Sequence, residues 1–163
     1  AHSKQLCPID KAWMEKDEHY EELKSSQYNE LLVPIDDNLR QANPLVFVQT
    51  PQDRRCDFSM VVMTKEPFEG EVGYQDVEKL MPQMQAMLED LGGMFASWFT
   101  PNVEGVTLEF ADKLNSTIQF SNGDVKPIVD GKVQVALSEI GEGGYMTLPQ
   151  QTARVLPYLP NAK

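Results

Sequence analysis

Apolar and polar residues alternate along the first and last thirds of the chain, which is the pattern of β-strands with one buried face. Early in the chain, short runs around Trp13 and Tyr20 predict a pair of strands, with a helix from Asp10 as the rival interpretation. Further strands are predicted over residues 32–35, 44–48, 56–63, 106–110, 116–120, 133–137, 145–148 and 153–159. Both thirds are therefore expected to be antiparallel β structure.

The middle of the chain has a different period. From Tyr74 to Phe99 the apolar residues recur every three or four positions, as in an amphipathic helix. Pro82 has no amide hydrogen, so it predicts a kink or a new helix start, and Gly92-Gly93 predicts a helix end. The stripe contains Met81, Met84, Met87, Met94 and Trp98. These side chains fit three interpretations: a helix packed on the β units, an adaptable surface for a partner, or a copper-binding thioether cluster.

Turn residues divide the predicted strands. Asn122-Gly123 and Asp130-Gly131 are the dipeptides that type I′ hairpins prefer, because both central residues need a positive φ. Residues 36–38 read Asp-Asp-Asn and predict another turn. Pro149, Pro157 and Pro160 cannot donate to a strand ladder, so the last strand is expected at a sheet edge.

The predicted fold class is α+β, mainly β: two small antiparallel β-sandwich-like units joined by a helical segment. We place the first unit at residues 1–66, the helical connector at 67–103 and the second unit at 104–163. The two β units match weakly, residues 33–37 with 135–139 and 43–47 with 144–148, which indicates an internal repeat or a coincidence of similar strands. The second unit has extra strands before the matched part. We therefore expect one or two strands upstream of Ala1, or another element or chain in their place.

Charge limits the classes of partner. The chain of 163 residues has 25 Asp and Glu against 14 Lys and Arg, a formal net charge of −11, and no basic stripe. Nucleic acid and anionic lipid surfaces would repel such a protein. Its longest apolar runs are as short as a strand, so we expect no membrane span.

The two cysteines, Cys7 and Cys56, lie 49 residues apart, with no second cysteine or nearby histidine at zinc-site spacing. A disulfide between them would suit an exported protein, and two unconnected small apolar residues are the alternative. The chain begins with alanine, as after removal of a signal peptide, which also favours a periplasmic or secreted location.

Few residues offer a basis for catalysis. His19 stands in an acidic stretch that we interpret as a solvated face, and no nucleophile motif accompanies it. Carboxylates are numerous, so a glycosidase-like pair is conceivable, but it needs two of them facing one cleft. We therefore expect no catalytic residue, no metal and no cofactor.

Five short strings resemble an exported family of unknown function from Gram-negative bacteria. They are Cys7-Pro8-Ile9, Leu39-Arg40-Gln41-Ala42, Cys56-Asp57-Phe58-Ser59, Pro82-Gln83-Met84-Gln85 and Val155-Leu156-Pro157-Tyr158. The resemblance covers nearly the whole chain and implies export to the periplasm with no assigned activity. It supplies no functional residues.

The function expected from these observations is a noncatalytic exported binding or structural module whose partner is a protein or glycan of the cell envelope. One alternative is a cell-envelope hydrolase that uses paired carboxylates. Another is an inhibitor or assembly factor that docks through an edge strand or the methionine-rich helix.

Overall fold

A computed structural model describes residues 6–26, 29–33, 37–53, 55–57, 61–92 and 102–160. The chain forms two compact units, Ala1–Ser59 and Met60–Lys163. The fold is mainly β with short helices, which confirms the predicted α+β class. Within the described residues, every helix is too short or too polar to span a lipid bilayer.

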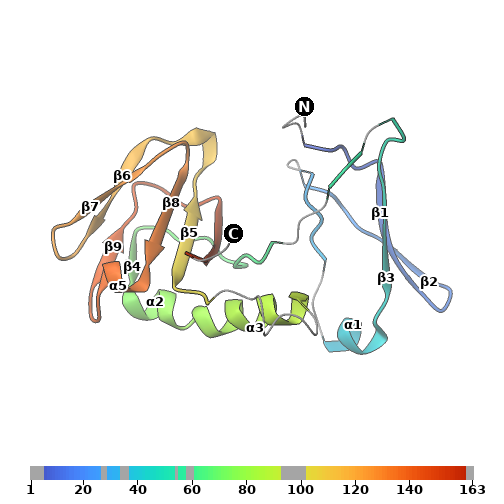
Figure 1. The fold of residues 1–163 in the computed structure, drawn as a ribbon, viewed down its shortest axis with the longest axis horizontal. Helices are drawn as coiled ribbons and strands as arrows, with labels where there is room; N and C mark the ends of the chain where they lie inside the picture. Colours follow the sequence, from blue (N-terminus) through green and yellow to red (C-terminus); the bar gives the residue numbers. More distant parts are fainter. Residues whose placement is uncertain are drawn as a thin grey trace. The chain divides into compact units, whose positions relative to one another are not determined.

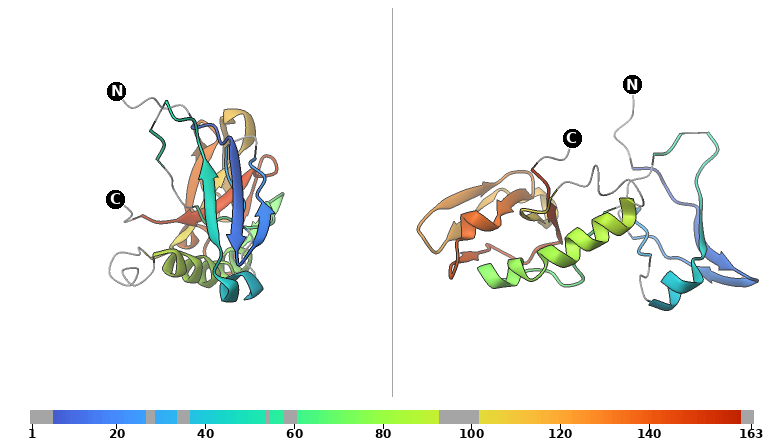
Figure 2. Two further views of the ribbon diagram at one scale, coloured as in Figure 1. Left: turned by 90° about the vertical axis from the view of Figure 1, so that its right-hand side faces the viewer. Right: turned by 60° about the horizontal axis from the view of Figure 1, so that its bottom comes forward.

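The first unit is built on one antiparallel sheet of order β2-β1-β3. Its strands are β1 (Lys11–Lys16), β2 (His19–Glu22) and β3 (Leu45–Gln49), and the helix α1 (Asp37–Ala42) precedes β3. Figures 1 and 2 show the three strands side by side. The hairpin between β1 and β2 turns at Asp17 and Glu18, which both have a positive φ, as a two-residue type I′ loop requires.

Alternation gives this sheet two faces. Ala12, Met14 and Leu23 are buried and form a small core with Ile9, Leu31 and Val48 around it. We call their side of the sheet the inner face. Trp13 lies between Ala12 and Met14 in β1, so its side chain projects from the opposite side, the outer face.

The second unit contains two antiparallel sheets, of order β10-β5-β8 and β4-β9-β6-β7. Their strands are β4 (Glu71–Gly73), β5 (Gly105–Glu109), β6 (Ser116–Phe120), β7 (Val125–Ile128), β8 (Lys132–Ala136), β9 (Tyr145–Thr147) and β10 (Arg154–Tyr158). The helices are α2 (Tyr74–Glu78), α3 (Met81–Gly92) and α5 (Leu137–Ile140), with the 3-10 turn η2 (Ala111–Lys113). Seventeen buried apolar residues, contributed by both sheets, α2, α3, α5 and the segments next to them, form one core that includes Leu108, Ile118 and Met146. This unit has the two sheets that the sequence predicted, whereas the first unit has a single sheet among its described residues and not the predicted sandwich.

The two ends of the second unit are joined by hydrogen bonds. The amide of Thr64 donates to the carbonyl of Val155 at 3.0 Å, and the amide of Leu148 donates to the carbonyl of Gly70 at 2.9 Å. Phe68 and the buried Thr152 make a further pair, because each amide donates to an oxygen of the other residue. The segment before β4 is thereby fixed to residues 148–155.

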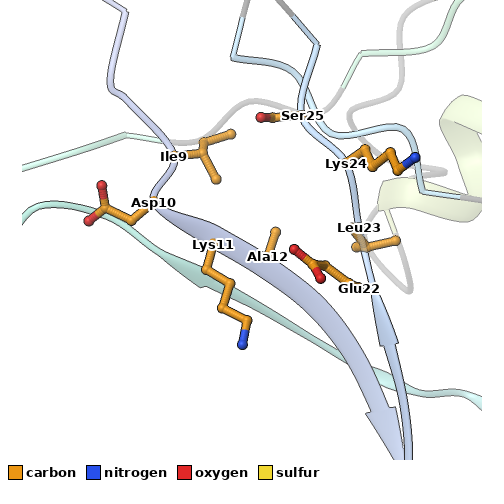
Figure 3. Close-up of a pocket in the computed structure, with 8 residues that line it drawn as sticks. All are labelled: Ile9, Asp10, Lys11, Ala12, Glu22, Leu23, Lys24 and Ser25. Atoms are coloured by element: carbon orange, nitrogen blue, oxygen red, sulfur yellow. The ribbon is translucent and has the colours of Figure 1, made fainter.

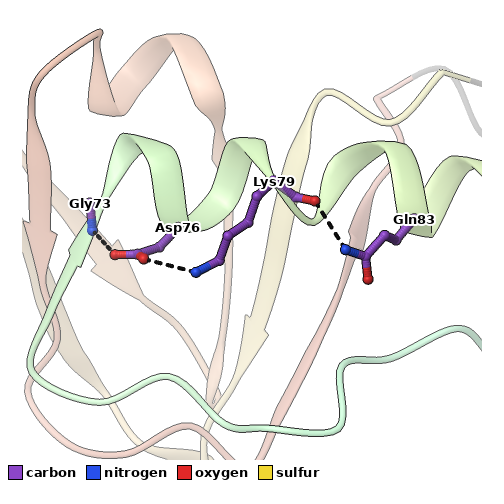
Figure 4. A network of polar contacts seen from close by, with 4 residues as sticks. All are labelled: Gly73, Asp76, Lys79 and Gln83. Carbon is purple, nitrogen blue, oxygen red and sulfur yellow. Dashed lines mark hydrogen bonds and ion pairs between the residues drawn. The ribbon is translucent and has the colours of Figure 1, made fainter.

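Helix α2 begins with a polar network, drawn in Figure 4. The Gly73 amide donates to Asp76 Oδ2 at 2.9 Å, and Lys79 Nζ lies 3.2 Å from Asp76 Oδ1. The first of these bonds, followed by that with Lys79, lowers the pKa of Asp76. Gln83 donates to the Lys79 carbonyl at 3.4 Å, which links α2 to the start of α3.

Several predicted elements are confirmed and several are wrong. The β1–β2 pair forms, a new helix starts at Met81 beside Pro82, and β10 is an edge strand. Residues 56, 57 and 61–63 form no strand, because this stretch enters no ladder within the described residues. Residues 37 and 38, predicted as a turn, begin α1.

The division of the chain differs from the predicted boundaries at residues 66 and 103. It falls between residues 59 and 60, and the helices that we assigned to a connector lie within the second unit. Val77 of α2 and Met84 of α3 are buried in that unit's core.

Candidate functional site

Three aromatic rings line up across the outer face of the first unit. Trp13 in β1 lies directly opposite Phe47 in β3, and their ring centroids are 5.3 Å apart with planes 12° from parallel. Tyr20 in β2 lies on the other side, 6.2 Å from Trp13 with an interplanar angle of 29°. We call these three side chains the aromatic ladder. Tyr20 is 51% exposed and Phe47 is 38% exposed.

The geometry of the ladder determines which surfaces it offers. Two rings at 5.3 Å with nearly parallel planes form an offset stack, because coplanar rings at that distance would clash at their edges and a full face-to-face sandwich would bring the centroids closer. The rings therefore stand on the sheet, and each covers part of its neighbour's face. A partner meets mainly ring edges and the two outer ring faces, in a strip three strands wide.

Lys11 adds a cation to this strip. Its Nζ lies 5.4 Å from the ring centroid of Trp13 and 5.3 Å from that of Tyr20, within the range of cation–π attraction. Hydrogen bonding to Tyr20, and then the electrostatic attraction of its hydroxyl oxygen, raise the pKa of Lys11. The lysine is thus fully charged at neutral pH and held over the rings.

Carboxylates border the ladder. Glu22 lies opposite Trp13 in β2, and its charge adds to the rise in the pKa of Lys11. Glu15 follows Trp13 on the same face of β1, and its Oε2 accepts a hydrogen bond of 3.4 Å from Trp13 Nε1. The outer face therefore combines a stacked apolar strip with charges of both signs.

A shallow hollow lies at the end of the sheet where β1 begins and β2 finishes (Figure 3). Its volume is about 330 Å³, and it is lined by residues 9–12 and 22–25. Ile9, Ala12 and Leu23 provide its apolar part, and Lys11 and Glu22 connect it to the outer face. A hollow of this volume can take one side chain of a partner.

The structure brings the two cysteines together. Cys7 and Cys56 form a disulfide with their Cα atoms 6.0 Å apart, as the sequence predicted. The bond links the residues just before β1 to the segment after β3, so it closes a loop around nearly the whole first unit.

The methionines predicted as a possible partner surface lie against the second core. Met84 is 3% exposed, and Met81 and Met87 are partly buried against the same core. Helical spacing turned this stripe inward, so Met84 is unavailable to a partner. Met94 and Trp98 lie outside the described residues.

Glu109 and Glu139 of the second unit are engaged in ion pairs. Glu109 accepts from Arg154 Nη2 at 2.6 Å and lies 3.3 Å from Lys132 Nζ. Glu139 lies 2.8 Å from Lys126 Nζ and also accepts from the Ala136 amide. In the part of the chain that the structure describes, no three His, Cys, Asp or Glu side chains gather at metal-binding distance.

Sequence reasoning missed the aromatic ladder, although its signal was present. Trp13 shares the alternating phase of Lys11 and Glu15, which is the polar phase of β1. An aromatic residue in the polar phase of a strand stands on the exposed face of its sheet. The contact with Phe47 depends on the register of β1 with β3, which are separated by more than 25 residues.

The fold and its surface define a mainly β, disulfide-containing protein with an aromatic sheet face. The family DUF2987, described as a protein of unknown function, matches residues 1–110, and the chain belongs to this family. The match covers the first unit and continues through β5 of the second. No curated protein and no solved structure matches the chain.

Proposed function

We propose that this protein is a noncatalytic exported module that binds a protein partner through the outer face of its first unit. The observation that carries the proposal is the aromatic ladder with Lys11 above it. Tyrosine, tryptophan and phenylalanine are enriched at the centres of protein interfaces, where they contribute large contact areas. The carboxylates of Glu15 and Glu22 lie beside Trp13, as charges do in interfaces that select their partner electrostatically.

Export is part of the proposal because the disulfide persists only in an oxidising compartment. A periplasmic or secreted location provides that environment. The acidic composition, 25 Asp and Glu against 14 Lys and Arg, supports a protein partner over nucleic acid or an anionic membrane surface.

A protein partner fits the ladder better than a glycan does. Sugar rings stack on exposed aromatic faces, whereas Tyr20 and Phe47 each cover part of a face of Trp13. Ring edges and the outer faces of Tyr20 and Phe47 instead suit apolar side chains of a protein partner. If the module acted only as a structural spacer, these exposed rings would have no role.

The proposal can be tested by site-specific photocrosslinking in cells that express the native gene. A photoreactive phenylalanine analogue at Tyr20 should give a discrete protein adduct, which Phe47→Ser abolishes. The matched control places the analogue at Tyr145, an exposed tyrosine of the second unit, where no adduct is expected. Equal adducts at both positions, or none at Tyr20, would refute the interface. Thiol alkylation of the same cells tests export separately, since Cys7 and Cys56 should react only after reduction.

A further inference from the structure

Strand β3 is an edge strand without the usual protection. Natural edge strands carry charged residues or proline, which prevent another strand from pairing with them. Every other edge strand of the described sheets has such a residue: Glu21 in β2, Glu71 in β4, Lys126 in β7, Lys132 in β8 and Arg154 in β10. In contrast, β3 reads Leu-Val-Phe-Val-Gln, and Leu45, Val46 and Phe47 are 67%, 43% and 38% exposed.

The backbone of β3 shows which groups this edge presents. Leu23 N–H donates to the Ala12 carbonyl, so the backbone of Ala12 faces β2 and that of its neighbours Lys11 and Trp13 faces β3. Their partners in the register are Gln49 and Phe47, which consequently use their N–H and C=O groups toward β1. The backbone groups of Val46 and Val48 point the other way. They form the outer edge of β3, which pairs with no strand among the described residues.

The second unit contains the same local arrangement with this edge occupied. There the strands β9-β6-β7 lie in the same spatial order as β3-β1-β2, and the short helix α5 precedes β9 as α1 precedes β3, although β8 intervenes between β7 and α5 in the chain. Met146 of β9 lies opposite the buried Phe120, as Val46 lies opposite the buried Met14. On its other side, β9 pairs antiparallel with β4, and Met146 faces Val72.

We propose that the outer edge of β3 binds an extended segment of a partner polypeptide as an added antiparallel strand, in the way that β4 pairs with β9. Val46 and Val48 would supply the backbone hydrogen bonds, and an apolar residue of the partner would lie beside Val46, as Val72 lies beside Met146. This site uses the backbone of the edge, so it is separate from the outer face of the proposed function.

Charge indicates the chemistry of the partner segment. Residues 1–59 contain eleven Asp and Glu against seven Lys and Arg, whereas β3 itself is uncharged. A segment with an apolar centre and basic flanks is therefore complementary to this unit. A second copy of the chain, with its own net charge of −11, is less suitable.

The test uses the full oxidised chain and a fluorescent peptide with the sequence of residues 68–75, which contains β4. Saturable binding is expected below about 1 mM, with tighter binding of the peptide that carries E69K and E71K. Methylation of the peptide nitrogen at Val72 should weaken binding about tenfold, because that N–H faces the edge. Methylation at Gly73, whose N–H faces away from the edge, is the matched control and should leave the affinity unchanged.

Protein variants complete the test. Val46→Pro removes one edge N–H without touching the ladder with β1, and it should abolish peptide binding, whereas Val46→Thr should preserve it. Tyr20→Ser should also preserve it, which separates this site from the outer face. Absence of binding, or equal binding of both methylated peptides, would overturn the proposal. The proposal would also be overturned if the protein alone formed a dimer and Val46→Pro converted it to a monomer. The strand bound at the edge of β3 would then belong to a second copy of the chain.

Discussion

Reduction of the Cys7–Cys56 disulfide should unfold the first unit and leave the second intact. The bond closes a loop with a sequence separation of 49, for which the chain-entropy relation gives about 4 kcal/mol of stabilisation. Typical domains have a free energy of unfolding of about 5–15 kcal/mol, and small ones lie at the low end. The first unit has only Ala12, Met14 and Leu23 as buried apolar side chains among its described residues. The disulfide is therefore comparable to the whole stability of this unit.

The assay follows Trp13 fluorescence in urea with and without dithiothreitol. The chain has two tryptophans, so Trp98→Phe leaves Trp13 as the sole reporter. Reduction should lower the midpoint of the Trp13 transition by several molar urea, given a urea dependence of about 1 kcal/mol per molar for so small a unit. Hydrogen exchange of peptides from residues 102–160 should stay unchanged, because both cysteines lie in the first unit.

The double variant C7A/C56A controls for the reductant, since it should behave like the reduced protein and show no response to dithiothreitol. A shift below about 1 kcal/mol in the Trp13 transition would refute the reasoning, because the first unit would then hold its fold through side-chain packing alone. If reduction also removed the protection of residues 102–160 from hydrogen exchange, the reasoning would be refuted, because the two units would then unfold together.

Two further predictions concern local backbone and charge. Glu18→Gly should stabilise the first unit by about 0.5–1 kcal/mol, as measured by urea unfolding. Glu18 has a φ of 68° in a type I′ loop, a conformation that glycine adopts without strain. An unchanged or lower stability of the variant would contradict this reasoning. Asp76→Asn should destabilise the second unit by about 0.5 kcal/mol or less at neutral pH, since the Asp76 side chain is 51% exposed. The folded-state pKa of Asp76 is lowered from 3.8, so its contribution is present above that value and is lost as the pH falls through the lower folded pKa. The stability difference between wild type and Asp76→Asn should therefore vanish in acid, and a constant difference would exclude the charge as its cause.

The turn dipeptides predicted the backbone conformation of a turn only where the register of the flanking strands fits a two-residue loop. At Asp130-Gly131 both residues have a positive φ, as predicted, and the Lys132 amide donates to the Val129 carbonyl at 3.0 Å. Of Asn122-Gly123, only Gly123 has a positive φ, because the β6–β7 hairpin uses a four-residue loop there. Dipeptide preference identifies a reversal of the chain, whereas the register of the flanking strands decides the loop length.

The sequence predicted which segments form strands, but it did not predict which strands pair with each other. Alternation correctly marked β5, β6, β8 and β10, but it gave no sign that β7 and β8 enter different sheets after a tight turn. Short helices were missed because α5 covers a single turn and its Leu137 continues the alternation of β8. Its start is fixed by Glu139, whose carboxylate accepts from the Ala136 amide.

Site prediction succeeded for the cysteine pair, because few side chains were candidates. It did not find the aromatic ladder, which depends on the register between strands that are distant in the sequence. Helical period alone could not decide whether the methionine stripe faced solvent or a core. The structure places Met84 in the second core, where α3 packs on the two sheets.

The position of β5 sets the order in which the two units can be completed. Both neighbours of β5, β8 and β10, come later in the chain, so the sheet cannot close until residue 158 is available. All three strands of the first unit and its disulfide lie before residue 57. As the polypeptide leaves a ribosome or a translocation pore with its N-terminus first, the first unit can fold about 100 residues ahead of the second. During that interval the emerging β4, α2, α3 and β5 expose apolar surface that the later strands of the second unit will cover.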